Sequence, residues 1–187
     1  VFPWEKVMRG IEEKILDISE PKSNTTSEKG YGKFGAELRD YTSPMQEEAL
    51  DYMESLKKSG VFEKYDNVYV TGHSKGGNNA TYLTIMDDSI RKSFAVNSPG
   101  FSNKFFEKYR DRIEKNGLKV YNNNTENDIV GTIMNQIGNK KYYTQLSYKN
   151  GFVDTHLATA MMDFDNLKPG EPFKMYETKQ SDCLLYT

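Results

Sequence analysis

One stretch of the chain has the residue types and spacing of a catalytic nucleophile. Ser74 is framed by Gly72 and Gly76, two residues before it and two residues after it. This Gly-x-Ser-x-Gly spacing is typical of a nucleophile elbow, in which a strand turns sharply into a helix and exposes the serine hydroxyl. Side chains at the two flanking positions would collide with the neighbouring strand and the helix start, so both positions favour glycine. The pattern therefore predicts that Ser74 is a nucleophile.

The residues around Ser74 match such an elbow. Val68–Thr71 is an apolar, β-branched run that predicts a strand, and Gly77–Met86 has the pattern of a buried helix. The backbone N–H of Lys75 then lies at a helix N-terminus, where it can stabilise a negatively charged oxygen. A glycine-rich turn or a phosphate-binding loop is the alternative. The phosphate-binding loop needs Gly-x-x-x-x-Gly-Lys-Ser/Thr, which this stretch does not have.

A serine hydroxyl needs a base to become a good nucleophile, and the chain has two histidines, His73 and His156. His73 directly precedes Ser74. Adjacent side chains that leave a strand point to opposite sides, so we expect His73 to be unable to take the Ser74 proton. The base is therefore predicted to be His156, in a loop after the last predicted strand. A structural histidine beside apolar residues is the alternative for His156.

The base in turn needs a carboxylate that fixes its tautomer and stabilises its charged form. In hydrolases with this elbow, the acid lies between the serine and the histidine along the chain. Asp128 ends a polar loop directly before an apolar stretch, and Glu126 in the same loop is the alternative. Asp154 is only two residues from His156 along the chain, so its carboxylate is badly placed to hydrogen-bond to the His156 ring. The predicted catalytic residues are therefore Ser74, Asp128 and His156.

Strands and helices alternate along the chain, which predicts an α/β fold with a mostly parallel sheet and helices on both faces. Further strands are expected at 93–97, 118–121 and 141–148, a polar loop at 122–128, and an amphipathic helix over 105–113. No strong strand signal precedes residue 68.

The clearest helix start lies at Ser43. Ser43 is expected to be the N-cap, with Pro44 at the first helical position and Gln46 completing a capping box. Gly60 is expected to end this helix, and Lys57 and Lys58 are expected to be a solvated helix end.

The overall composition excludes several classes of protein. The net charge is −2 and the basic residues are spread along the chain, which argues against a nucleic-acid partner. Aromatic residues make up 13% of the chain, so disorder is not expected. No apolar run approaches the ~20 residues of a membrane span. Two histidines and one cysteine give no metal-ligand spacing, and no cofactor is expected.

The ends of the chain carry weaker signals. Val1–Ile18 has the pattern of an amphipathic helix, and Ser19–Gly35 has the composition of a loop. The lone Cys183 and the lack of a signal-peptide pattern favour the cytoplasm. The chain begins with Val1 rather than Met, so it can be a fragment or a processed form. The oligomeric state has no sequence signal.

Four segments together resemble the Mbeg1-like family, a bacterial group of α/β-hydrolases similar to class 3 lipases. These segments are Gly72–Asn78, Asn97–Phe101, Asp128–Gly131 and the residue His156, and the resemblance covers roughly residues 40–165. It implies an α/β-hydrolase-like fold with a triad of Ser74, Asp128 and His156. The chain is then expected to be a single domain, with an N-terminal helix and loop at 1–40, the hydrolase core at 41–165 and a tail at 166–187.

The resemblance implies a lipase-like or esterase-like enzyme that acts on a small acyl ester or a lipid. The sequence departs from the family upstream of the elbow, where an Arg-Gly-Thr-like segment usually supplies a second oxyanion donor. The nearest string here is Arg9-Gly10-Ile11, inside the predicted first helix. The strands expected around it are not evident, so either they lie outside this chain or the protein has lost them. A catalytically inactive hydrolase fold used for binding is therefore the alternative function.

Overall fold

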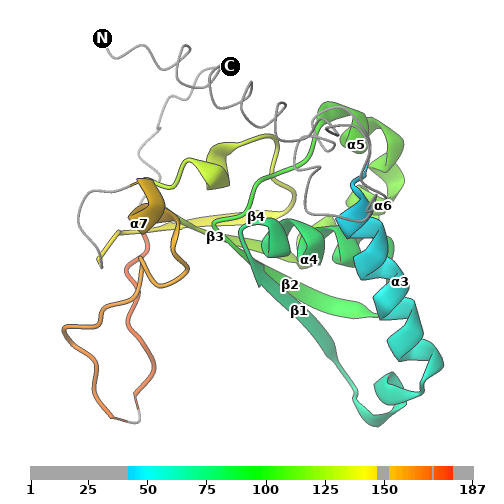
Figure 1. Ribbon diagram of the computed structural model, residues 1–187, viewed down its shortest axis with the longest axis horizontal. Helices are drawn as coiled ribbons and strands as arrows, with labels where there is room; N and C mark the ends of the chain where they lie inside the picture. The colour runs from blue at the N-terminus through cyan, green and yellow to red at the C-terminus, as the bar shows by residue number, and fades with distance from the viewer. Residues whose placement is uncertain (1–41, 147–151, 170, 179–187) are drawn as a thin grey trace, which may run out of the picture.

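Within the part of the chain that the structure describes, the central sheet has four strands, all parallel and ordered as they occur in the chain. A computed structural model describes residues 42–146, 152–169 and 171–178 (Figure 1). The predicted segments at 1–40 lie outside these residues. The strands are β1 (Val68–His73), β2 (Ile90–Val96), β3 (Val120–Thr125) and β4 (Asn139–Tyr143).

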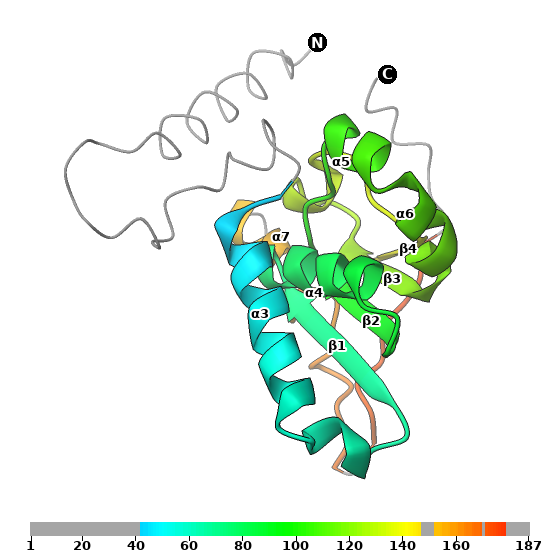
Figure 2. The ribbon, with the colours of Figure 1, turned by 90° about the vertical axis from the view of Figure 1, so that its right-hand side faces the viewer.

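Helices connect consecutive strands and pack on the sheet. The α-helices are α3 (Pro44–Lys58), α4 (Lys75–Met86), α5 (Asn103–Lys108), α6 (Arg110–Asn116) and α7 (Phe152–His156). Short 3-10 turns are η1 (Val61–Lys64), η2 (Gly117–Lys119) and η3 (Val130–Thr132). Figure 2 shows α4 lying over β1 and β2, between α3 and α6. The predicted α/β class with a mostly parallel sheet is confirmed.

The described helices that link the strands share one face of the sheet. Strands that follow chain order, with right-handed crossovers, place all their connections on the same side. A buried cluster fills the space between this face and the helices: Tyr82, Ile85, Phe101, Phe105, Val120 and Ile137. The opposite face carries Tyr69 and Phe94, which are 53% and 38% exposed. Helices over that second face stay a prediction, because they would come from outside the described residues.

The predicted start of α3 is confirmed. The Ser43 hydroxyl accepts a hydrogen bond from the Gln46 backbone N–H, and the Gln46 side chain accepts one from the Ser43 N–H. Pro44 occupies the first helical position, where its missing N–H costs nothing. Gln46 is fully buried and also donates from Nε2 to Asn78 Oδ1 at 2.7 Å, so the cap fixes α3 against α4.

The predicted strand at 118–121 is wrong at both ends. The structure has β3 at Val120–Thr125, so the strand continues into the region predicted as a polar loop. Asn122 is buried and donates from Nδ2 to the Ile137 carbonyl at 2.7 Å, and Asn124 is buried and donates to the Gln136 side chain at 3.0 Å. Polar side chains can occupy an interior strand when each amide is paired in this way.

Three other predicted elements differ in extent. The helix predicted over 105–113 is two helices, α5 and α6, separated at Tyr109. The last strand is shorter than predicted and begins earlier, at Asn139. His156 does not lie in a loop, as predicted, but is the last residue of the short helix α7. Among the described residues, no helix is both long enough and apolar enough to cross a bilayer.

Lys57 is not part of a solvated helix end. Its Nζ lies 2.5 Å from Asp87 Oδ2, and the Asp87 side chain is only 6% exposed. Burial alone would raise the pKa of Asp87, but hydrogen bonds from Lys57 and Ser89 outweigh this effect and lower the pKa below its ordinary value of 3.8. Asp87 is the C-cap of α4, so the ion pair joins the end of α3 to the end of α4. Lys58 is 80% exposed, as predicted.

We predict that Lys57→Met lowers the free energy of unfolding at pH 7 by about 1–3 kcal/mol, because it leaves a buried carboxylate without its charged donor. The pKa of Asp87 is depressed in the folded state. The stabilisation is therefore present above the ordinary pKa and is lost as the pH falls through the folded-state pKa. Urea unfolding at pH 7 and in acid measures this difference.

Lys58→Met is the matched control. Its Nζ lies 3.9 Å from Glu54 on the exposed surface, so the change should stay within about 0.5 kcal/mol at either pH. Equal effects of the two substitutions at pH 7 would contradict the role assigned to Lys57.

Candidate active site

Ser74 stands at a sharp turn between β1 and α4. Its backbone has φ 55° and ψ −126°, in the positive-φ region that residues other than glycine seldom adopt. The Ser74 N–H donates to the Val96 carbonyl at 2.9 Å, which extends the pairing of β1 with β2. The Ser74 carbonyl accepts from the N–H groups of Gly77 and Asn78 at 3.0 and 3.2 Å, which starts the helix. The strand and the helix thus hold the strained residue from both sides.

Glycines make this turn possible, but not both of the predicted ones. A Cβ on Gly72 would lie 2.2 Å from the backbone C and O of Gly76, so Gly72 is required as predicted. A Cβ on Gly76 would meet nothing within 4 Å, so the prediction of a collision there is wrong. The second required glycine is Gly77, where a Cβ would lie 2.8 Å from Ser98 Cβ and 2.9 Å from the Gly72 carbonyl oxygen.

Lys75 is the first residue of α4, as the elbow requires. Its side chain runs to the start of α3, where Nζ lies 3.3 Å from Ser43 Oγ and 3.1 Å from Asn78 Oδ1. Burial lowers the pKa of Lys75 to about 7. The side chain thus connects the two helix starts, and only the main-chain N–H of Lys75 enters the oxyanion prediction.

His156 and Asp128 form a hydrogen-bonded pair. His156 Nδ1 lies 2.9 Å from Asp128 Oδ1, with the carboxylate side chain 1% exposed and the imidazole 20% exposed. Asp128 also accepts from the Gly131 N–H at 2.7 Å and from the Val130 N–H at 3.3 Å. A Cβ on Gly131 would lie 2.8 Å from Asn124 Oδ1, so glycine allows this close approach of the backbone to the acid.

This pairing fixes the chemistry of the ring. Because Nδ1 donates its proton to a carboxylate, the neutral His156 ring keeps a lone pair on Nε2, which is the arrangement of a general base. The alternative acids make no such bond: Glu126 accepts from the Gln145 N–H at 3.4 Å, and no contact joins Asp154 to the ring among the described residues. Of the three candidate carboxylates, only Asp128 is hydrogen-bonded to His156.

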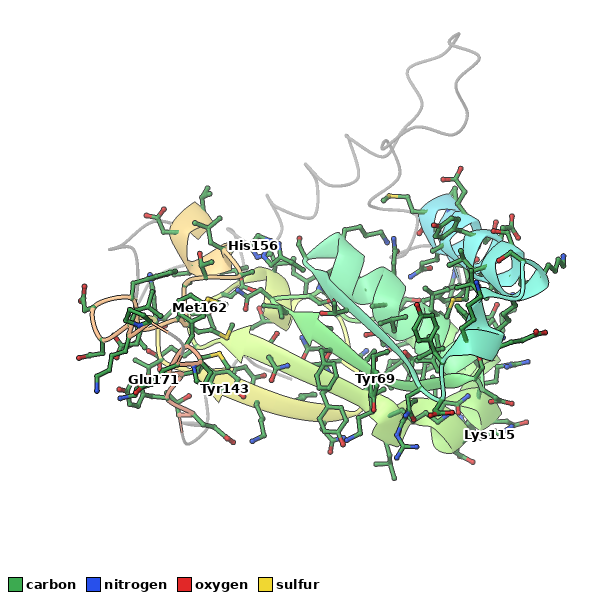
Figure 3. The ribbon with its side chains drawn as sticks, turned by 90° about the horizontal axis from the view of Figure 1, so that it is seen from below. Tyr69, Lys115, Tyr143, His156, Met162 and Glu171 are labelled. Atoms are coloured by element: carbon green, nitrogen blue, oxygen red, sulfur yellow. The ribbon has the colours of Figure 1, made fainter. Side chains whose placement is uncertain are left out.

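The imidazole ring of His73, the residue directly before Ser74, lies beside the ring of His156. The His73 and His156 ring centroids are 4.7 Å apart, and His73 directly precedes Ser74. Figure 3 shows the His156 side chain between α7 and the start of α4. Within the described residues, the Ser74 hydroxyl and the His156 ring make no hydrogen bond to one another. Such bonds are often long in unliganded enzymes and tighten when substrate binds.

Two further residues hold this pair, and neither was predicted as part of the site. His73 Nε2 hydrogen-bonds to the His156 carbonyl, and Asn97 Nδ2 lies 3.2 Å from the same oxygen. Asn97 is fully buried and has φ 46°. Its position at the end of the strand predicted over 93–97 was the available signal, since the carboxyl ends of parallel strands meet at one edge of the sheet.

The described residues contain no group of three or more histidine, cysteine, aspartate or glutamate side chains that could hold a metal ion.

We predict that Gly72→Ala destabilises the fold by about 2 kcal/mol or more, because the new methyl group meets backbone atoms that cannot move without displacing the elbow. Gly76→Ala is the matched control. It adds a methyl group in open space inside a helix and should be neutral or stabilising by up to about 1 kcal/mol. Urea unfolding compares the two, and equal destabilisation would contradict the packing described for the elbow.

Comparison with known proteins places the chain in a family. No curated protein matches the sequence. The model of the Mbeg1-like family matches residues 39–157, more than half of the chain. The matched span runs from just before α3 to just after α7, and it contains Ser74, Asp128 and His156. The chain belongs to the Mbeg1-like family.

Proposed function

We propose that this protein is a serine hydrolase that cleaves a carboxylic ester through an acyl-enzyme. Ser74 is the nucleophile, His156 the general base, Asp128 the acid that orients it, and the Lys75 N–H an oxyanion donor. The observation that carries the proposal is the 2.9 Å hydrogen bond between His156 Nδ1 and the buried Asp128. A second observation supports it: Ser74 has the positive φ that a nucleophile elbow requires.

The first half of the reaction forms the acyl-enzyme. His156 Nε2 takes the proton from the Ser74 hydroxyl as Oγ attacks the acyl carbon, and the carbonyl oxygen becomes an oxyanion. The Lys75 N–H at the start of α4 donates to that oxygen, aided by the helix dipole. The Asp128 carboxylate stabilises the imidazolium. His156 then gives its proton to the alkoxide as the ester C–O bond breaks, which releases the alcohol.

The second half clears the acyl-enzyme. A water molecule loses a proton to His156 Nε2 as its oxygen attacks the acyl carbon. The second tetrahedral intermediate collapses, the bond to Ser74 breaks, and His156 returns the proton to Oγ. The carboxylic acid leaves and the enzyme is restored. A small acyl ester or a lipid is the substrate class we propose, on the basis of the lipase-like family.

A binding domain that has kept the hydrolase fold without turnover is the second candidate. The observation that favours it is the lack of a hydrogen bond between the Ser74 hydroxyl and the His156 ring in the described part of the chain. The two candidates differ in one property, because only an enzyme activates Ser74 toward electrophiles.

We predict that a fluorophosphonate probe labels the protein and that Ser74→Ala abolishes the label, because the phosphonyl group bonds to an activated serine oxygen. His156→Ala and Asp128→Asn should each lower kcat/KM on a short-chain p-nitrophenyl ester by about 10³- to 10⁴-fold. In-gel fluorescence and absorbance assays measure these effects.

Asp154→Asn is the matched control. Asp154 lies on α7, two residues from His156, and no contact joins it to the ring among the described residues. Its removal should change kcat/KM by less than about threefold, because it alters only the long-range field. Absence of label on the unmodified protein, together with no ester turnover above background, would favour the binding domain over the enzyme.

A further inference from the structure

Two residues at the ends of neighbouring strands hydrogen-bond to the backbone carbonyl of His156. His73 is the last residue of β1, and its Nε2 donates to this carbonyl oxygen. Asn97 directly follows β2, and its Nδ2 donates to the same oxygen at 3.2 Å. A carbonyl oxygen has two lone pairs, so this one is satisfied entirely by side chains from two neighbouring strands.

Asn97 also reaches the strand that leads to the acid. Its Oδ1 accepts from the Thr125 N–H at 2.7 Å, and Thr125 is the last residue of β3. The Thr125 carbonyl in turn accepts from the Asp128 N–H at 3.0 Å. The other end of the amide, Nδ2, also lies 3.3 Å from the Thr155 carbonyl and 3.4 Å from the Leu157 carbonyl. One buried amide therefore joins the acid-bearing turn to the base-bearing helix.

Only a few residue types can do this. The side chain must accept from one backbone N–H and donate to a backbone carbonyl, and Asn has both groups whereas Asp has only acceptors. The backbone at position 97 has φ 46°, in the left-handed region that Asn tolerates better than most residues. His73 supplies a second donor and a ring whose centroid lies 4.7 Å from that of His156, at an interplanar angle of 42°.

We propose that Asn97 and His73 are positioning residues that hold the backbone of His156 so that its Nδ1 faces Asp128 and its Nε2 is left as the base. The α7 helix has five residues and cannot fix its own last residue by internal hydrogen bonds alone. The catalytic consequence rests on the proposed function, whereas the placement of the ring can be measured without any activity.

The test uses the imidazole nitrogens of the full chain, which contains two histidines. Long-range proton–nitrogen NMR correlations report which ring nitrogen carries the proton. At a pH where both rings are neutral, His156 should be in the Nδ1–H form and His73 in the Nε2–H form. Asn97→Asp replaces the donor with an acceptor of nearly the same shape and should remove the Nδ1–H preference of His156.

Variants of His73 provide a second test with less risk to folding. His73→Phe keeps a ring at the contact but removes the donor, and it leaves His156 as the only histidine to assign. It should weaken the Nδ1–H preference, and His73→Gln, which restores a donor, should recover it. In an active protein, Asn97→Asp should lower kcat by about 100-fold and His73→Phe by about 10-fold, with KM little changed.

Asn122→Asp is the matched control. Asn122 is buried in β3, and its Nδ2 donates to the Ile137 and Asn139 carbonyls at 2.7 and 3.2 Å, away from the acid and the base. This substitution should lower stability without changing the His156 tautomer. If Asn122→Asp changed the His156 tautomer in the same way, the effect would come from a general loss of stability, and the proposal would be overturned.

The outcomes separate this proposal from the proposed function. If the unmodified protein neither turns over esters nor reacts with the probe, the proposed function fails but the NMR measurement still tests positioning. Loss of the Nδ1–H form of His156 in Asn97→Asp and His73→Phe then supports the proposal. Retention of the Nδ1–H form in folded Asn97→Asp and His73→Phe overturns the proposal, whether or not the protein is an enzyme. If Asn97→Asp does not fold, the comparison of His73→Phe with His73→Gln tests the proposal.

Discussion

The structure depends on a contact between backbone and backbone at the end of β1. Gly72 lies so close to Gly76 and Gly77 that no side chain fits between them. This contact lets the chain leave the strand and enter α4 within one residue, and it leaves Ser74 with a positive φ. A strained residue of this kind costs on the order of 1–3 kcal/mol. The pairing of Ser74 with Val96 and the first turn of α4 offset that cost.

A parallel sheet explains why the other groups gather near Ser74. All four strands end at the same edge, so the residues after β1, β2 and β3 are neighbours there although they are far apart in the chain. Ser74 follows β1, Asn97 follows β2, and Asp128 follows β3 by a short turn. His156 lies on α7, a helix of five residues that is too short to fix the orientation of the imidazole ring by itself. The buried amide of Asn97 joins the segments that meet at this edge.

The sequence predicted what depends on local chemistry. The capping box at Ser43 needs only residues within one turn of a helix. The elbow at Ser74 could be predicted from a strand, a helix and the glycine at position 72. Chain order allowed both Asp128 and Glu126 as the acid, and the apolar stretch after Asp128 favoured that residue. In the structure Asp128 is hydrogen-bonded to His156.

What the sequence missed depends on contacts between distant segments. Gly77 is required because of Ser98, and Lys57 is paired because α4 ends beside it. The polar residues of β3 resemble a loop until their partners across the sheet are known. The role of Asn97 follows from three separate segments meeting at one amide, which no local pattern encodes.

The most direct measurement of the central claim is a crystal structure of the protein after reaction with a phosphonate ester. We expect a covalent bond from phosphorus to Ser74 Oγ, with the phosphoryl oxygen facing the Lys75 N–H. We also expect His156 Nε2 within about 2.6–3.2 Å of Ser74 Oγ, while Nδ1 keeps its bond to Asp128. A His156 ring turned away from the adduct, or an adduct on another residue, would contradict the assignment of Ser74 and His156 as nucleophile and base.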